Sequence, residues 1–120
     1  MNDLSTQSCE ACQIDAPKVP QDQIKTLLLE IDDWVLIEEP INKLKKVFSF
    51  KSYKESLDFS NKVAELADEE DHHPQILLEW GKVTVTWWSH KIEGLHHNDF
   101  ICAAKTDKLF QIRITPDETK

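Results

Sequence analysis

The five histidines of this 120-residue sequence all lie between residues 72 and 97. An imidazole has an unperturbed pKa of about 6.5, so its two nitrogens can donate and accept protons near neutral pH. His72 and His73 are adjacent, and His90 follows a segment in which apolar and polar residues alternate. If this segment folds back as a hairpin, the three rings can line one cleft. The clustering therefore favours an acid–base site.

Two carboxylates are spaced to orient these rings. Asp68 precedes His72 by one helical turn and Asp99 opens the expected final helix, so either carboxylate could fix an imidazole tautomer. A lone histidine is more often a surface residue or a satisfied structural residue than a catalyst. We expect this of His96 and His97, at the start of the last helix. For the other three histidines, the residues alone leave a functional and a structural interpretation open.

A metal site is a competing interpretation of the same residues. The five histidines and one nearby carboxylate offer enough nitrogen and oxygen ligands for a zinc ion: His72, His73, His90, His96, His97 and Asp99. Their spacing matches no helix-borne His-x-x-x-His pattern. Cys9 and Cys12 lack the second cysteine pair that would complete a structural zinc site. We therefore expect no metal, and we interpret Cys9 and Cys12 as plain thiols, with metal binding by this arm as the alternative.

Hydrophobic periodicity predicts the elements that must position these side chains. Ser52 and Glu55 form a capping box at the start of a long helix. Pro74 disfavours a helical conformation at His73, so the helix ends before it. Between these limits one apolar stripe is formed by Leu57, Val63, Ala64 and Ala67, with Ser60 between them. We expect helices over 21–30, 53–70 and 98–110, and strands over 34–38, 43–50, 76–80 and 82–90.

This order of elements predicts an α+β domain. It has a four-stranded antiparallel sheet with three helices packed on one face, in the order α-β-β-α-β-β-α. In the last strand, the period of two puts His90 on the same face as Thr84. We expect one domain over residues 20–112, a flexible N-terminal arm over 1–19 and a charged tail over 113–120.

Composition and charge argue against several classes of protein. The net charge of -8 would repel a phosphate backbone, so direct nucleic-acid binding is not expected. Gly81 and Gly94 are too few glycines for a dinucleotide or phosphate loop. No apolar run suits a membrane span, and the N-terminus lacks the apolar stretch of a signal peptide. We expect a cytoplasmic protein without membrane contact, whose three cysteines form no disulfide.

The spacing of the candidate residues resembles the signature of the pterin-4a-carbinolamine dehydratase family. That signature is formed by Asp68, His72-His73-Pro74, Trp80, His90 and Asp99, separated by three, five, nine and eight residues. The segments Cys9-Glu-Ala-Cys12, Asp33-Trp34 and Gly94-Leu95 also look like those of bacterial members. The resemblance covers residues 20 to 110, which is nearly the whole predicted domain.

This resemblance implies a dehydratase that uses no metal and no organic cofactor. The 4a-hydroxyl of a tetrahydropterin would leave as water and N5 would lose its proton, giving a quinonoid dihydropterin. That reaction recycles the pterin of aromatic amino-acid hydroxylases. Because hydroxide is a poor leaving group, the two proton transfers need positioned acid–base groups. By carry-over, the catalytic set is His72, His73 and His90, supported by Asp68 and Asp99.

Four further positions are substrate contacts by the same resemblance: Asp71, Trp88, Ser89 and Lys91. Ile76 stands where many members have an aromatic residue, and Ser89 stands where Thr is frequent. Neither difference removes an ionisable group, so both concern the shape of the pocket. An extended backbone would point the adjacent side chains of His72 and His73 apart. Either a local bend brings both rings to the pterin, or their roles are unequal.

A non-enzymatic interaction protein is the second competing interpretation. Animal members of the family also act as a dimerisation cofactor of a homeodomain transcription factor, and some relatives have protein-assembly roles. The four tryptophans could mark an interface or pack in the core: Trp34, Trp80, Trp87 and Trp88. An unpaired sheet edge would favour a homodimer, and two dimers could form a tetramer. The intact histidine trio favours the enzyme, because an interface needs no acid–base set.

Overall fold

The computed structural model describes Leu4 and residues 18–112. Cys9 and Cys12 lie outside these residues, as do the predicted charged tail and nearly all of the predicted N-terminal arm. The predicted domain limits, 20–112, therefore stay predictions. Within the described residues, no helix combines the length and the apolar composition that a bilayer crossing requires.

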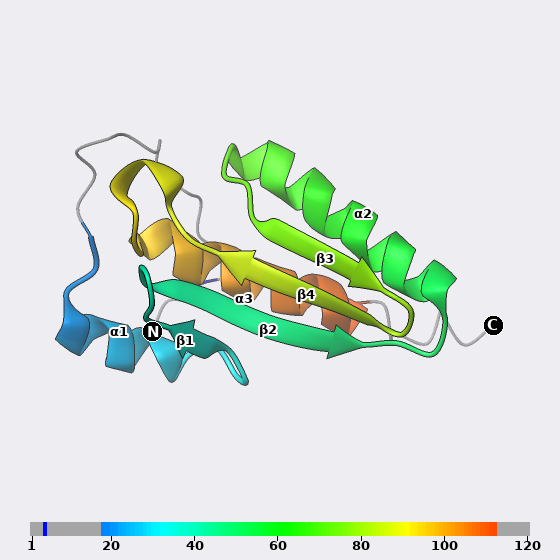
Figure 1. Ribbon diagram of the computed structural model, residues 1–120, viewed down its shortest axis with the longest axis horizontal. Helices are drawn as coiled ribbons and strands as arrows, with labels where there is room; N and C mark the ends of the chain where they lie inside the picture. Colours follow the sequence, from blue (N-terminus) through cyan, green and yellow to red (C-terminus); the bar gives the residue numbers. More distant parts are fainter. Residues whose placement is uncertain (1–3, 5–17, 113–120) are drawn as a thin grey trace.

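Three α-helices, four strands and a short 3-10 helix form the described part of the chain (Figure 1). In chain order they are α1 (Gln21–Leu28), β1 (Val35–Ile37), β2 (Lys43–Ser49), α2 (Tyr53–Glu70), β3 (Gln75–Glu79), β4 (Lys82–Trp87), η2 (His90–Ile92) and α3 (His97–Ile112). The strands form one antiparallel sheet in the order β1-β2-β4-β3, and the helices pack on one of its faces. The predicted fold class and element order are confirmed.

The first helix is shorter than predicted. α1 ends at Leu28, whereas the sequence predicted a helix to residue 30. The backbone N–H groups of Leu29 and Glu30 bond to carbonyls three residues back, at 3.2 and 3.0 Å. Bonds of this spacing tighten a helix end into a 3-10 turn. Apolar periodicity continues through Leu29, so it could not reveal this change.

The last strand is also shorter than predicted, and this moves a candidate residue. β4 ends at Trp87, and the chain then reverses between Ser89 and Gly94, whose backbone groups bond to each other at 2.8 and 3.4 Å. His90 lies in η2, inside this reversal. The prediction that His90 continues the strand on the face of Thr84 is therefore wrong.

The long helix begins as predicted, and its buried stripe matches the predicted one at Ser60, Val63 and Ala67. The hydroxyl of Ser52 accepts the backbone N–H of Glu55 at 3.1 Å, which confirms the cap. Leu57 and Ala64 are exposed, so that part of the predicted stripe is wrong. The buried positions of α2 are Ser56, Phe59, Ser60, Val63, Leu66 and Ala67. Its two buried serines satisfy their hydroxyls by donating to carbonyls four residues back.

The core lies between the helices and the covered face of the sheet. Five side chains on that face are at most 2% exposed: Leu44, Phe48, Val83, Val85 and Trp87. Phe59 of α2 and Phe110 of α3 pack on Phe48, with ring centroids 4.9 and 5.1 Å away. Val47 and Leu77 lie on the uncovered face and are exposed. Trp87 ends the buried row, and the candidate residues follow it directly along the chain.

The four tryptophans divide between the two interpretations of their role. Trp34 and Trp87 are buried in the core, and Trp88 is half-buried. Trp80 lies in the turn between β3 and β4 and is 71% exposed. Core packing therefore accounts for Trp34 and Trp87 but not for Trp80.

The carboxylate of Asp107 joins α3 to the sheet. It accepts the indole N–H of Trp34 at 3.1 and 3.0 Å and pairs with the Lys46 ammonium of β2 at 2.8 Å. Lys46 also donates to the carbonyl of Asp32 at 3.0 Å. Burial raises the pKa of Asp107 above its usual 3.8, while the hydrogen bonds from Lys46 and Trp34 oppose that rise. The protonation of Asp107 is therefore coupled to the packing of α3.

Candidate active site

A left-handed turn at the end of α2 directs the first candidate histidine inward. Asp71 has φ 52° and ψ 42°, and the N–H groups of Asp71 and His72 bond back to the carbonyls of Asp68 and Ala67. These paired bonds form a Schellman motif, which stops the helix and turns the chain. The backbone then extends into β3. As a result, His72 is 5% exposed while the neighbouring His73 lies on the surface.

His72 meets a fully buried carboxylate. Its Nε2 atom lies 2.6 Å from Oδ1 of Asp99, in the first turn of α3. Oδ2 of the same carboxylate accepts the hydroxyl of Ser89 at 2.8 Å and the backbone N–H of His96 at 2.9 Å. With Asp99 ionised, its carboxylate only accepts hydrogen bonds, so the contact then requires the proton of a neutral His72 ring on Nε2 and leaves Nδ1 as the acceptor nitrogen. These three hydrogen-bond donors replace the water molecules that the Asp99 carboxylate loses on burial.

The face of the same ring is also held. The His72 ring is nearly parallel to the Trp87 indole, with an interplanar angle of 8° and centroids 5.6 Å apart. Trp87 has no exposed surface. His72 is therefore fixed at one edge by Asp99 and on one face by Trp87.

The second and third candidate histidines are exposed and joined to each other. Nε2 of His73 lies 3.0 Å from Oδ1 of Asp68, and the two side chains are 58% and 82% exposed. Nε2 of His90 donates to the backbone carbonyl of His73 at 3.1 Å. Figure 1 shows the result: the yellow segment that contains η2 lies beside the green loop between α2 and β3. The two segments that carry the candidate histidines are thus brought together.

The substrate-contact candidates occupy different depths. Asp71 and Lys91 are exposed, and Trp88 is half-buried with its ring centroid 4.3 Å from that of His90. The ammonium of Lys43, a residue that the sequence did not single out, lies 4.1 Å from the Trp88 centroid. Ser89 has no exposed surface, because its side chain lies behind His72 against Asp99. It is placed to act through that carboxylate.

The remaining histidines lie at the start of the last helix, where His96 is a buried structural residue rather than a surface one. His96 is 4% exposed, and its Nδ1 accepts the backbone N–H of Asn98 at 3.0 Å. The backbone N–H of His96 donates to the Asp99 carboxylate three residues later, and the Asp99 N–H returns to the His96 carbonyl at 3.0 Å. The spacing of a cap residue and an acidic residue at the third helical position signals this arrangement. His97 is half-buried.

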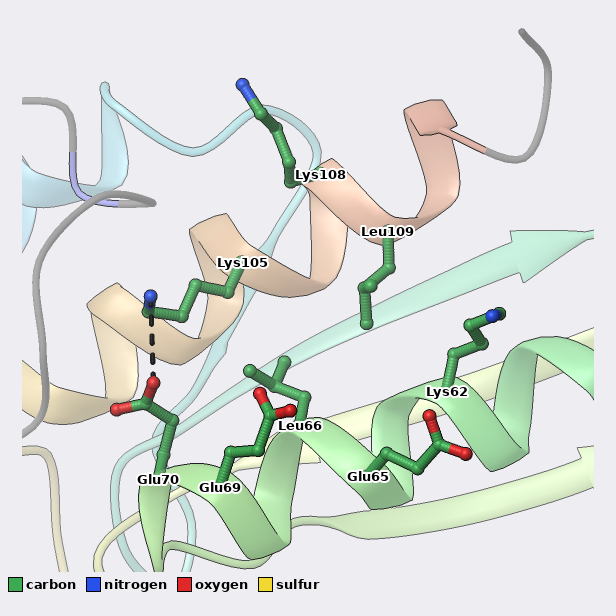
Figure 2. A pocket seen from close by; sticks show the side chains of 8 residues that line it. All are labelled: Lys62, Glu65, Leu66, Glu69, Glu70, Lys105, Lys108 and Leu109. Carbon is green, nitrogen blue, oxygen red and sulfur yellow. Dashed lines mark ion pairs between the residues drawn. The ribbon is translucent and has the colours of Figure 1, made fainter.

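A groove lies elsewhere, between α2 and α3 (Figure 2). Its volume is about 230 Å³, and Lys105 and Glu70 form an ion pair across it at 3.6 Å. Its lining is Lys62, Glu65, Leu66, Glu69, Glu70, Lys105, Lys108 and Leu109. None of the candidate histidines lines it, and its charged side chains balance in sign. Among the described residues, no group of three or more potential ligands is arranged to hold a metal ion.

Comparisons with known proteins agree on one family. Residues 17–109 match the family model described as pterin 4 alpha carbinolamine dehydratase. A protein of Nitrosococcus oceani named "Putative pterin-4-alpha-carbinolamine dehydratase" is 56% identical over 112 residues, which cover 92% of this chain and 99% of that protein.

Two solved structures are similar in fold. A structure described as a transcriptional coactivator/pterin dehydratase from Brucella melitensis has a TM-score of 0.73 at 22% identity, covering 78% of this chain and 98% of that chain. A pterin dehydratase-like protein described as a RuBisCO assembly factor in the alpha-carboxysome has a TM-score of 0.55 at 28% identity. That match covers 64% of this chain and 88% of the other.

Proposed function

This chain belongs to the pterin 4 alpha carbinolamine dehydratase family, and on that premise we propose that it dehydrates a 4a-hydroxytetrahydropterin to a quinonoid dihydropterin. The observation that carries this proposal is the arrangement of three histidines on two joined segments. One ring is buried and fixed by a carboxylate, and two are exposed. The reaction would recycle the pterin used by aromatic amino-acid hydroxylases.

The proposed chemistry is general acid–base catalysis by His72, His73 and His90. One imidazolium protonates the 4a-hydroxyl. The C4a–O bond then breaks, and its electron pair stays on the oxygen of the departing water molecule. A neutral imidazole accepts the N5 proton, so that the N5–H electron pair forms the C4a=N5 double bond. One imidazole gains a proton and another loses one, and exchange with solvent restores both. Positioned groups of this kind accelerate a proton-transfer step by about 10²- to 10⁴-fold.

The environments of the histidines support unequal roles. His73 and His90 are open to a substrate arriving from solvent. The Nε2 atom of His72 is committed to Asp99, so only its Nδ1 edge is left for proton transfer. Asp68 and Asp99 serve as the orienting carboxylates for the exposed and the buried ring, respectively.

The pterin itself would bind around the two histidine segments. We assign Asp71, Trp88 and Lys91 to its contacts, because they flank these segments and none is buried. Ser89 acts from behind, by holding the carboxylate of Asp99. The expected cytoplasmic location and the pairing of two chains into a homodimer, or of two dimers into a tetramer, stay predictions.

A non-enzymatic assembly role is the second candidate function. It is favoured by the similarity to a pterin dehydratase-like protein described as a RuBisCO assembly factor, and by the exposed Trp80. The two functions differ in what they demand of His73 and His90. An assembly surface needs no proton transfer, so it tolerates the loss of either imidazole.

Stopped-flow absorbance of freshly generated 4a-hydroxytetrahydropterin tests the proposal. Wild-type protein is compared with His73→Ala and His90→Ala, and with His97→Ala as a matched histidine outside the proposed set. Each is measured with and without a chelator. We expect rapid wild-type turnover that is insensitive to the chelator, lost in the first two variants and kept in the third.

Other outcomes overturn specific parts of the proposal. If folded wild-type protein does not exceed the spontaneous rate, the enzyme assignment is wrong and the assembly role becomes the better account. If the chelator abolishes turnover, the metal-free mechanism is wrong. Full activity in both His73→Ala and His90→Ala would contradict the acid–base set.

A further inference from the structure

The face of His72 is held by a residue that belongs to the sheet. The ring lies nearly parallel to the Trp87 indole, and both side chains are at most 5% exposed. Trp87 is the last residue of β4, and its backbone pairs with Leu44 of β2. The position of the indole therefore depends on the sheet, but its ring plane depends on what the indole N–H contacts.

A buried hydrogen-bond chain sets that ring plane. The Nε1–H of Trp87 donates to Oγ1 of Thr106 at 3.0 Å, and the Thr106 hydroxyl donates to the carbonyl of Cys102 at 2.7 Å. Thr106 and Trp87 have no exposed surface. The indole nitrogen donates one hydrogen bond and accepts none. A single orientation of the Trp87 ring therefore allows the hydrogen bond to Thr106. Rotation would leave a buried donor unpaired.

One helix therefore holds His72 from two directions. Asp99 and Thr106 are seven residues apart in α3, which puts them on the same side of the helix two turns apart. Asp99 bonds to the edge of the imidazole, and Thr106 orients the indole on which the ring is stacked. The two contacts fix both the direction and the plane of the ring.

We infer that Thr106 and Trp87 are positioning residues for His72, acting through the indole N–H to Oγ1 hydrogen bond. Neither residue touches solvent, and neither is placed to exchange a proton with a substrate. Their kinetic consequence rests on the proposed dehydration. Their effect on the imidazole of His72 does not, and it can be measured without any substrate.

The first test replaces the threonine. Thr106→Val keeps the shape of the side chain but removes the acceptor of the indole N–H, whereas Thr106→Ser keeps the hydroxyl. Because small misplacements of a catalytic group are costly, we expect kcat to fall by about tenfold in Thr106→Val with KM within about twofold. Thr106→Ser should restore most of kcat.

A matched control removes a buried hydroxyl of the same kind elsewhere. Ser60 in α2 is buried and donates to the carbonyl four residues back, as Thr106 does, but no other side chain is described as bonding to it. Ser60→Ala should leave kcat unchanged. If Ser60→Ala lowers kcat as much as Thr106→Val, the loss reflects general destabilisation and the inference is wrong.

The second variant approaches the same bond from the other side. Trp87→Phe removes the indole N–H while leaving an aromatic ring near His72. If the bond is what matters, the double variant Trp87→Phe/Thr106→Val should lose no more kcat than the more damaged single variant. Independent losses that multiply would overturn the inference. Urea unfolding of each variant gives the fraction of the protein that is folded, so that kcat is expressed per folded molecule.

The third readout does not depend on activity. Long-range proton–nitrogen NMR correlations of the histidine rings report which nitrogen of His72 carries the proton. We expect one form protonated at Nε2 in wild type and Thr106→Ser, and an exchanging or shifted signal in Thr106→Val. Unchanged His72 signals in folded Thr106→Val contradict the inference even if the wild type proves to be no dehydratase. Absence of wild-type turnover with the expected signals contradicts only the proposed function.

Discussion

At the residue scale, the adjacent side chains of His72 and His73 occupy opposite environments. His72 is bonded to a carboxylate without exposed surface, whereas His73 is bonded to Asp68 in a pair open to water. A hydrogen bond to a charged group is worth more in a dry environment, because water does not compete for it. The same residue types thus form a rigid contact in one case and a weak one in the other.

The buried contact predicts a large kinetic effect for one substitution. Asp99→Asn preserves the size of the side chain but replaces one accepting oxygen with a donating amide. That group cannot accept from both His72 and the Ser89–His96 donors, so we expect kcat to fall by at least about tenfold. The loss of a charge-assisted buried hydrogen bond should also lower the free energy of unfolding by about 1.5–3 kcal/mol. Stopped-flow turnover and urea unfolding measure the two effects.

The matched control is the same substitution at the exposed carboxylate. Asp68→Asn removes the partner of His73 in a pair that is 58% and 82% exposed. Solvated pairs of this kind contribute little, at most about 1 kcal/mol. We therefore expect kcat to change by less than about fivefold, the factor to which about 1 kcal/mol corresponds. Equal losses in Asp68→Asn and Asp99→Asn would show that burial does not decide the importance of the orienting carboxylate.

At the element scale, the end of α2 combines backbone strain with a proposed substrate contact. Asp71 adopts φ 52°, a left-handed conformation that costs a non-glycine residue roughly 1 kcal/mol. Asp71→Gly should therefore raise the free energy of unfolding by up to about 1 kcal/mol while raising KM for the pterin. Urea unfolding and steady-state turnover report the two quantities.

A second substitution at Asp71 separates the effect of the backbone conformation from the effect of the negative charge. Asn also tolerates the left-handed conformation, so Asp71→Asn should change KM without the gain in stability that glycine brings. If neither variant alters KM, the assignment of Asp71 to substrate binding is wrong.

The junction of α3 with the sheet predicts a pH dependence of stability. Because burial raises the folded pKa of Asp107 above 3.8, the folded state holds this proton more tightly than the unfolded chain. The contribution of Asp107 to stability is therefore complete below pH 3.8 and is lost as the pH rises through the raised pKa. Asp107→Asn removes the titration but keeps an acceptor for Trp34.

Urea unfolding between about pH 3.5 and 7 tests this sign. The stability of wild type relative to Asp107→Asn should decrease as the pH rises through that window. Asp58→Asn is the control, because it also removes a carboxylate but from an exposed ion pair with Lys54. A relative stability of wild type that increases with pH would contradict the assignment.

At the scale of the whole molecule, two strands of the sheet have an edge that pairs with no other strand among the described residues. β1 has three residues and β3 has five, so β3 offers the longer row of backbone donors and acceptors. We expect two chains to pair antiparallel through β3, with Leu77 at the centre of the strand facing its own copy. Light scattering after size exclusion should give twice the 13.9 kDa mass of one chain at micromolar concentration.

Substitutions at the two edges distinguish them. Leu77→Lys would place like charges opposite each other in the proposed pair, so the dimer should dissociate. Val35→Lys, at the edge formed by β1, should leave it intact. A wild-type monomer at these concentrations, or dissociation by Val35→Lys alone, would contradict pairing through β3.

The sequence by itself determined the order of the elements and the residues able to do chemistry. The cap at Ser52, the stop before Pro74 and the alternation around Val83 and Val85 are local signals, because they depend on backbone geometry within a few residues. The spacing of histidines and carboxylates from Asp68 to Asp99 identified the family. These features needed no knowledge of which elements pack together.

Only the tertiary structure decided which faces are buried and what holds each ring. Leu57 is exposed and Phe59 is buried because α3 and the sheet, not the apolar count, select the covered face of α2. His72 turns inward because a left-handed residue ends its helix, and Thr106 reaches it through Trp87 of another element. Such contacts join residues far apart in sequence, so periodicity cannot encode them: they exist only once the layers have packed.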